Sequence, residues 1–148
     1  MRIVVQRVQR ASCCVNGEVT GAIDKGFLIF IGYKNGDTAE AEDKLFKKLT
    51  GLRVFEDENG KMNRSLKDVS GSILAISQFT LYADCKKGNR PSFTEAMHFE
   101  EANNRYLSFC SRLREAGFRV EMGVFGADMK ISLINDGPVT IILDSDNL

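Results

Sequence analysis

The residue types that could carry chemistry gather at Ser77-Gln78-Phe79-Thr80-Leu81, the end of an apolar run that begins at Ile73. Two hydroxyls and an amide lie there just before an irregular loop, and functional sites commonly form where strands pass into loops. Thr80 or Ser77 could attack an ester, but a hydroxyl nucleophile needs a neighbouring base. The only histidine, His98, lies at the start of a predicted helix, where a surface or capping role is the simpler interpretation. From the pattern alone, the solvated end of a strand is favoured over a site.

A second candidate stretch runs from Lys130 to Asp144. Two runs rich in β-branched residues flank Asn135-Asp136-Gly137-Pro138, which predicts strand, turn, strand, as in a hairpin. Gly137 lacks a Cβ, so a ligand or partner could approach its backbone closely. Pro138 cannot donate to a ladder and lies at a strand start. The pattern predicts a turn and leaves the isomer of the Gly–Pro bond open.

Several other kinds of chemistry find no support in the sequence. One histidine and four cysteines without C-x-x-C spacing argue against a zinc site, and no phosphate-binding or dinucleotide motif is present. We therefore expect no metal and no cofactor. Lys plus Arg equals Asp plus Glu at 20 each, so no global positive field attracts nucleic acid. The cations of the loop after Leu81 (Lys86, Lys87 and Arg90) would suit phosphates locally.

The composition indicates one domain over residues 1–148, with 43% hydrophobic and 27% charged residues. The N-terminus has no apolar signal-peptide core, and the longest apolar run, Phe27–Tyr33, is too short to span a bilayer. We therefore expect a cytoplasmic protein without membrane association, whose four cysteines are free thiols.

The predicted elements follow from hydrophobic periodicity. We expect strands over residues 2–10, 27–33, 52–55, 73–81 and 118–122, a hairpin within 13–24 at Asn16-Gly17, and amphipathic helices over 39–50 and 99–116. Thr38 and Asp37 offer an N-cap for the first helix and Gly51 its end, whereas residues 62–66 stay unassigned. This pattern predicts an α+β fold with mostly antiparallel or mixed, barrel-like sheets and two helices. The apolar central strands need cover on both faces, from the helices and from a second sheet or another subunit.

The two candidate stretches together resemble the two signature motifs of the D-aminoacyl-tRNA deacylases: Ser-Gln-Phe-Thr-Leu at 77–81 and Asn-Asp-Gly-Pro-Val-Thr at 135–140. Supporting matches are Arg7-Val8, Ala11-Ser12, Met62-Asn63, residues 90–93 and residues 125–130, so the resemblance covers essentially the whole chain. It implies an enzyme that hydrolyses the ester joining a D-amino acid to the terminal ribose of tRNA, and that also removes glycine. It further implies a homodimer, in which each site binds the 3′ end of aminoacyl-tRNA and is completed by the other subunit's Gly–Pro turn, with that proline cis.

The resemblance also implies roles for individual residues. Ser77, Gln78, Phe79 and Thr80 would line the ester site, Gly137 and Pro138 would read chirality, and Arg7 and Met129 would brace that turn. A rigid backbone wall beside Cα would admit hydrogen and reject a side chain, and it could not distinguish glycine. Backbone N–H groups near residues 78–80 could stabilise an oxyanion, and the resemblance favours activation of water by the ribose 2′-hydroxyl over attack by Thr80.

Two other functions remain open on the sequence. One is a dimer that binds tRNA ends without turnover, and the other is a small-molecule esterase that uses Thr80 or Ser77.

Overall fold

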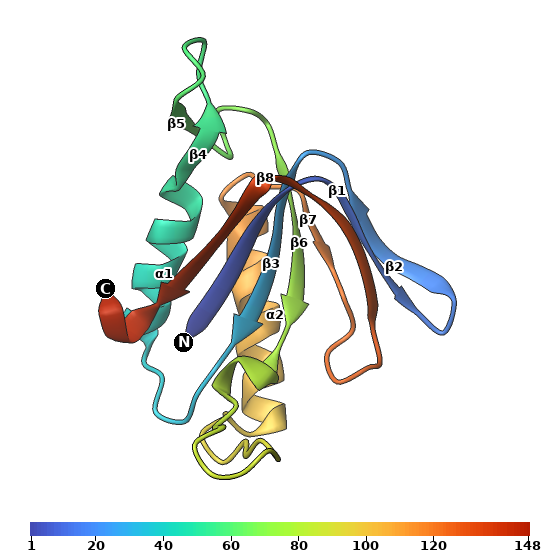
Figure 1. Ribbon diagram of the computed structural model, residues 1–148, viewed down its shortest axis with the longest axis vertical. Helices are drawn as coiled ribbons and strands as arrows, with labels where there is room; N and C mark the ends of the chain where they lie inside the picture. The colour runs from blue at the N-terminus through green and yellow to red at the C-terminus, as the bar shows by residue number, and fades with distance from the viewer.

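The long strand β1 (Arg2–Val15) organises the sheet of the computed structural model, which describes residues 1–148 (Figure 1). On one side β1 pairs antiparallel, first with β3 (Gly26–Gly32) and then with β2 (Glu18–Ile23). Asn16 and Gly17 join β1 to β2 with φ of 51° and 79°, the left-handed values that a two-residue hairpin turn requires. The predicted Asn-Gly hairpin is therefore confirmed.

The sheet continues through two parallel strands and curls back toward its first edge. β6 (Ser72–Ser77) pairs parallel with β3, and β7 (Val120–Met122) pairs parallel with β6, which gives the order β2-β1-β3-β6-β7. The two edges approach each other, since the Thr20 hydroxyl of β2 donates to the Met122 carbonyl of β7 at 3.1 Å. The result is a nearly closed barrel of mixed sheet, as the α+β prediction expected.

Both faces of the central strands are buried, but by different partners. Phe27 and Ile29 of β3 belong to the main core, a cluster of 24 buried residues that includes side chains of both helices. Leu28 of β3 and Leu74 of β6 point the other way, into a cluster of 7 buried residues inside the curl of the sheet. The second face is therefore covered by the same sheet as it curls, and not by the second sheet or other subunit that the sequence suggested.

Two amphipathic helices cover the outer face of the sheet, as predicted. In α1 (Ala39–Gly51) the Thr38 hydroxyl accepts the Ala41 N–H at 3.1 Å and caps the N-terminus. This helix includes Gly51, which the sequence predicted as its end; its C-cap is Leu52. α2 (Phe99–Glu115) buries the predicted stripe of Ala102, Tyr106, Phe109, Cys110 and Leu113. The Tyr106 hydroxyl donates to the Ala75 carbonyl at 2.6 Å and ties α2 to β6.

A two-stranded hairpin projects from the body beyond α1 (Figure 1). It consists of β4 (Arg53–Glu56) and β5 (Met62–Ser65), joined by a turn in which Gly60 has φ of 73°. The strand β5 occupies most of the stretch that the sequence left unassigned. It pairs only with β4 and is largely exposed, so it lacks the apolar alternation that predicts a strand.

The predicted hairpin over Lys130–Asp144 is wrong, because this stretch forms one continuous strand, β8. Its two halves pair with β1 and not with each other: Leu133 lies opposite Ala11, and Ile141 lies opposite Val5. Because β1 is itself long enough to pair with both halves, the segment at Gly137-Pro138 is a bulge within a strand instead of a reversal of the chain. A short 3-10 helix, η2 (Ser145–Asn147), follows β8.

The strand predicted over residues 73–81 is too long. β6 ends at Ser77, and a 3-10 helix, η1 (Phe79–Tyr82), follows it. The neighbouring strand β3 ends at Gly32, and the last bond between them runs from the Gln78 N–H to the Ile31 carbonyl at 2.7 Å. Beyond it no strand remains to pair with, so the backbone turns to local bonds. The structure contains no helix long and apolar enough to cross a membrane.

Candidate active site

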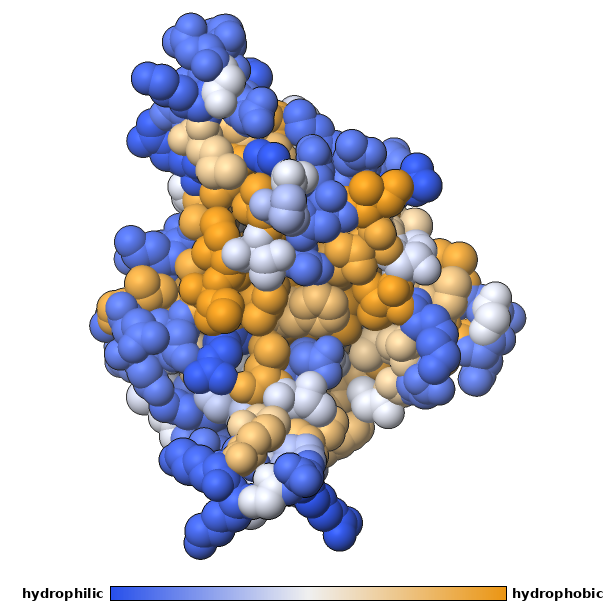
Figure 2. All heavy atoms as spheres, in the orientation of Figure 1, coloured by the Kyte–Doolittle hydropathy of each residue, from blue (hydrophilic) through white to orange (hydrophobic).

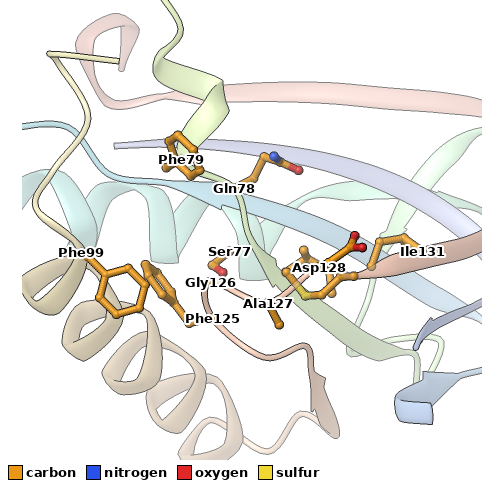
Figure 3. Close-up of a pocket in the computed structure, with 11 residues that line it drawn as sticks. Ser77, Gln78, Phe79, Phe99, Phe125, Gly126, Ala127, Asp128 and Ile131 are labelled. Atoms are coloured by element: carbon orange, nitrogen blue, oxygen red, sulfur yellow. The ribbon is translucent and has the colours of Figure 1, made fainter. Parts of the chain in front are cut away.

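A cavity of about 390 Å³ opens where β6 passes into η1 (Figure 3). Residues from β6 and η1 form one side, the segment between β7 and β8 forms another, and α2 contributes Phe99. The lining consists of Ile76, Ser77, Gln78, Phe79, Phe99, Phe125, Gly126, Ala127, Asp128, Met129 and Ile131. The sequence-predicted residues Ser77, Gln78, Phe79 and Met129 are therefore brought together at one cavity.

Aromatic rings make up much of its wall. Phe99 and Phe125 meet edge to face with their centroids 4.8 Å apart, and Gly126, which has φ of 78°, leaves room for the Phe99 ring. A Cβ at position 126 would lie 2.6 Å from that ring. Phe79 meets Phe93 in the same manner at 5.0 Å. Phe79, Phe99 and Phe125 also line a second cavity of about 290 Å³ whose lining residues are all hydrophobic, so the two cavities share these three side chains as walls.

Polar groups at the cavity are few. They are the Ser77 hydroxyl, the Gln78 amide and the Asp128 carboxylate, which bonds to exposed Lys130 at 3.0 Å. No histidine or cysteine belongs to the lining. All four cysteines are free, as predicted, and burial raises the pKa of the Cys110 thiol to about 12. His98 is the exposed N-cap residue of α2, and its side chain makes no capping bond.

Thr80 lies on η1, just outside the cavity lining, and is exposed. Its hydroxyl oxygen accepts a hydrogen bond from the Gln78 side-chain amide. An amide is not a base that can remove the hydroxyl proton, so this contact orients Thr80 without activating it as a nucleophile.

The backbone at the start of η1 carries N–H groups beside the cavity. The Gln78 N–H is engaged by the Ile31 carbonyl, but the first N–H groups of a helix have no partner within that helix. The N–H groups of Phe79 and Thr80 are thus the candidate donors for a developing oxyanion.

Arg7, Gly137 and Pro138 lie at a different place from this cavity. The Gly137–Pro138 peptide bond is cis, and both residues are exposed at the tip of the β8 bulge. The buried Arg7 side chain donates from Nε to the Asp136 carbonyl at 2.8 Å. Within one chain, Arg7 therefore lies at the Gly–Pro turn and Met129 at the cavity, and the turn does not reach the cavity's lining.

The remaining lining residues could be anticipated only in part. The segment from Phe125 to Met129 is irregular and lies between two strands, which is a common setting for a site. Phe99 carried no such signal, because it reads as the first apolar residue of a helix; its 58% exposure becomes meaningful only beside Phe125. No group of three His, Cys, Asp or Glu side chains is placed to hold a metal ion.

The fold and the cavity together define a class of protein: a small α+β barrel with an aromatic-walled cavity at the end of a parallel strand. Comparison with known proteins then narrows this class: the family described as D-Tyr-tRNA(Tyr) deacylase matches residues 4–144. The chain belongs to this family, as the two motifs indicated.

Individual relatives are similar over nearly the full chain. A D-aminoacyl-tRNA deacylase of Exiguobacterium sibiricum is 56% identical over 144 residues, covering 97% of this chain and 99% of the relative. One of Clostridium novyi is 54% identical, covering 98% of this chain and 97% of the relative. One of Thermotoga petrophila is 52% identical over 148 residues, covering 100% of this chain and 99% of the relative.

Two solved structures share the fold. One, described as a c-Myc DNA unwinding element binding protein, superposes with a TM-score of 0.91 at 44% identity, covering 97% of this chain and 98% of the other. The other, a probable eukaryotic D-amino acid tRNA deacylase, gives a TM-score of 0.76 at 20% identity with the same coverage of 97% and 98%.

Proposed function

We propose that this protein is a D-aminoacyl-tRNA deacylase, a hydrolase that cleaves the ester of D-aminoacyl-tRNA and releases the D-amino acid and free tRNA. One observation carries the proposal: Ser77, Gln78 and Phe79 line a cavity in a chain that is 52–56% identical, over nearly its whole length, to relatives named for this activity. An aminoacyl group and the sugar that bears it would occupy the aromatic-walled space.

Stabilisation of the tetrahedral oxyanion would come from the backbone. The candidate donors, the N–H groups of Phe79 and Thr80, lie at the start of η1, and their positions are fixed by a 3-10 helix instead of a mobile side chain. Removing one such donor in other enzymes costs about 2.7–4 kcal/mol of transition-state stabilisation. A preorganised pair would therefore supply much of the catalysis.

The base that activates water would come from the substrate. No histidine lines the cavity, and the Thr80 hydroxyl faces an amide. The ribose 2′-hydroxyl lies next to the ester in every aminoacyl-tRNA, so it is available to assist water without any protein base.

Chirality would be read by the Gly137–Pro138 turn of a second copy in a homodimer. The turn is exposed and separate from its own chain's cavity, which leaves it free to enter another. Exposed apolar residues occur along β8, with Ile142 at 65% and Leu133 at 37% exposure, and they offer apolar contact area for such a partner. Figure 2 shows apolar side chains gathered on the side of the molecule where β8 crosses in front in Figure 1. A backbone wall at Gly137 would exclude an L side chain and admit hydrogen, so glycyl-tRNA would also be hydrolysed.

The test is release of amino acid from D-tyrosyl-, L-tyrosyl- and glycyl-tRNA. We expect fast loss of the D and glycyl esters while the L ester stays intact. Survival of all three would contradict catalysis and point to binding without turnover. Equal loss of D and L esters would leave an esterase without the steric filter.

A further inference from the structure

The Gly137–Pro138 turn belongs to an unusually large bulge between β8 and β1. Val8 lies opposite Asn135, and Gln6 lies opposite Thr140. Only Arg7 separates the two positions on β1, whereas Asp136, Gly137, Pro138 and Val139 separate them on β8. The extra residues must leave the ladder, so the bulge depends on contacts other than the ladder to define its shape.

Asn135 closes the base of this bulge with its side chain. Its Oδ1 accepts the Val139 N–H at 2.8 Å, and its Nδ2 donates to the Val139 carbonyl at 3.1 Å. Nδ2 also lies 3.2 Å from the Thr140 hydroxyl oxygen. One amide thus satisfies both backbone groups of Val139, as a neighbouring strand residue would, while the Val139 side chain is anchored in the main core.

The other arm of the bulge is held independently by Arg7. Its Nε donates to the Asp136 carbonyl, and its Nη1 donates to the Val54 carbonyl of β4 at 2.5 Å. Gly137 lies close to both Val139 and Arg7. Its φ is 146°, and a Cβ there would lie 2.7 Å from the Val139 side chain and 3.3 Å from the Arg7 side chain. The tip has little room to move while both arms are held.

We propose that Asn135 is a positioning residue for stereoselectivity: its side-chain amide holds the Gly137–Pro138 turn where it separates D from L substrates. This inference rests on the proposed function of the turn. Distinguishing hydrogen from a side chain at Cα demands accurate placement, and misplacement of about 1 Å can cost 100-fold in an enzyme. Without the amide, the Val139 N–H and carbonyl lose their partner, and the arm after Pro138 is released while Arg7 still holds the arm before it.

The experiment compares kcat/KM for D- and L-tyrosyl-tRNA in Asn135→Ala and Asn135→Asp. We call the two hydrogen bonds between the Asn135 amide and the Val139 backbone the clamp. The carboxylate in Asn135→Asp can still accept the Val139 N–H but cannot donate to the Val139 carbonyl, so this variant tests the donated bond alone. It also provides a second, more conservative variant in case Asn135→Ala does not fold. We expect the D/L ratio to fall at least tenfold in both variants with the fold retained by circular dichroism.

Two substitutions serve as matched controls. Gln6→Ala removes a side chain that bonds to the Thr140 hydroxyl at 3.2 Å but not to Val139, and Asn104→Ala removes an exposed asparagine of α2. Both should keep the D/L ratio within about twofold of the wild type. An unchanged ratio in folded Asn135 variants, even with lower overall activity, would overturn the proposal and leave Asn135 a purely structural residue.

Amide hydrogen exchange at Val139 tests the clamp without substrate. Exchange should accelerate at least tenfold in Asn135→Ala relative to the wild type, and unchanged exchange would contradict the clamp. A wild type that does not hydrolyse D-tyrosyl-tRNA would overturn the proposed function, whereas the exchange measurement would still decide whether Asn135 holds the turn.

Discussion

At the scale of single residues, Thr80 separates two mechanisms for the same cavity. As a nucleophile it would be indispensable, but its hydroxyl bonds to the Gln78 amide and has no base beside it. With water activated by the substrate and the oxyanion held by backbone N–H groups, the Thr80 side chain contributes only packing and orientation at the rim.

We therefore expect Thr80→Ser and Thr80→Ala to keep kcat/KM for D-tyrosyl-tRNA within about tenfold of the wild type, the size of effect that a single lost hydrogen bond has. A bulky replacement, Thr80→Trp, should abolish activity by obstructing the rim of the cavity. Thr50→Ala is a suitable control, because that hydroxyl bonds only within α1. Near-complete loss of turnover in Thr80→Ala with substrate binding intact would establish Thr80 as a nucleophile.

At the scale of elements, the loop 84–92 connects η1 to Phe93, which lines the second, apolar cavity. Reciprocal backbone bonds of 2.7 and 2.9 Å between Asp84 and Ser92 close its base, directly between η1 and Phe93. Lys86, Lys87 and Arg90 are exposed on it and form no salt bridge with any acidic residue. A chain of zero net charge therefore carries unpaired cations on a loop between two cavity-lining residues, Phe79 and Phe93, and we propose that these cations contact the tRNA end.

Replacing Lys86 and Lys87 together by glutamine should raise KM for D-tyrosyl-tRNA several-fold and weaken its dependence on salt. For single-stranded nucleic acid, each phosphate contact adds about 0.7 to the steepness with which the logarithm of the binding constant falls with the logarithm of salt concentration. Loss of two contacts should therefore reduce that steepness by about 1.4. Hydrolysis of a D-tyrosyl ester of adenosine, which lacks those phosphates, should not change. Lys47→Gln with Lys48→Gln on the exposed side of α1 is the matched control, and an equal effect there would contradict a local role.

A second feature at this scale is a set of Arg2 contacts that ties η1 to the ends of β1 and β8. Arg2 donates to the Leu81 carbonyl at 2.6 Å and to the Asp144 carboxylate at 2.8 Å. Burial alone favours neutral Asp144, but the Asp146 N–H and the Arg2 guanidinium outweigh burial and hold the pKa of Asp144 below its usual value. A carboxyl whose pKa is lowered by folding stabilises the fold above its unfolded pKa, and that stability is lost as pH falls through the folded pKa.

Asp144→Asn should therefore lower the free energy of unfolding by about 1 kcal/mol at pH 7, a modest value because Arg2 is partly exposed. The difference in the free energy of unfolding between variant and wild type should stay constant down to about pH 5 and shrink below pH 4. Urea unfolding at several pH values measures it. The exposed ion pair of Asp128 and Lys130 provides the control, since Asp128→Asn should leave the free energy of unfolding nearly unchanged. If the stability difference for Asp144→Asn persisted at pH 2, the loss of stability would not arise from the Asp144 charge.

At the scale of the whole molecule, we propose that the site is divided between two copies of the chain. The cavity and the exposed Gly137–Pro138 turn lie at separate places in one chain, so a site that uses both must take them from two subunits. This arrangement can be tested by complementation between two inactive variants.

Thr80→Trp obstructs the cavity and leaves the turn intact. Gly137→Val leaves the cavity intact but puts a side chain on the proposed backbone wall, at a strained φ of 146°, where it would also exclude a D substrate from the partner's site. Each homodimer should be inactive. Refolding an equal mixture should restore about a quarter of the wild-type activity, because half of the dimers are mixed and each has one intact site. No recovery in mixtures that contain heterodimers would show that cavity and turn act within one subunit.

The sequence by itself determined the local elements and the family. Periodicity located both helices and the central strands, Asn16-Gly17 specified a hairpin because few residues other than Asn, Asp and Gly adopt left-handed φ readily, and the motifs at 77–81 and 135–140 indicated the deacylase family. These features depend on residues close in the chain, so their signal is present before folding.

Only the tertiary structure decided what depends on distant partners. Lys130–Asp144 is one bulged strand instead of a hairpin because β1 pairs with both of its halves, and the strand at Ile73 ends at Ser77 because β3 ends beside it. Phe99 of α2 joins the cavity, Met129 lies there and not beside Arg7, and Asn135 closes the bulge through Val139. Hydrophobic periodicity reports which face of an element is buried, but it carries no information about which strand, helix or side chain will cover that face.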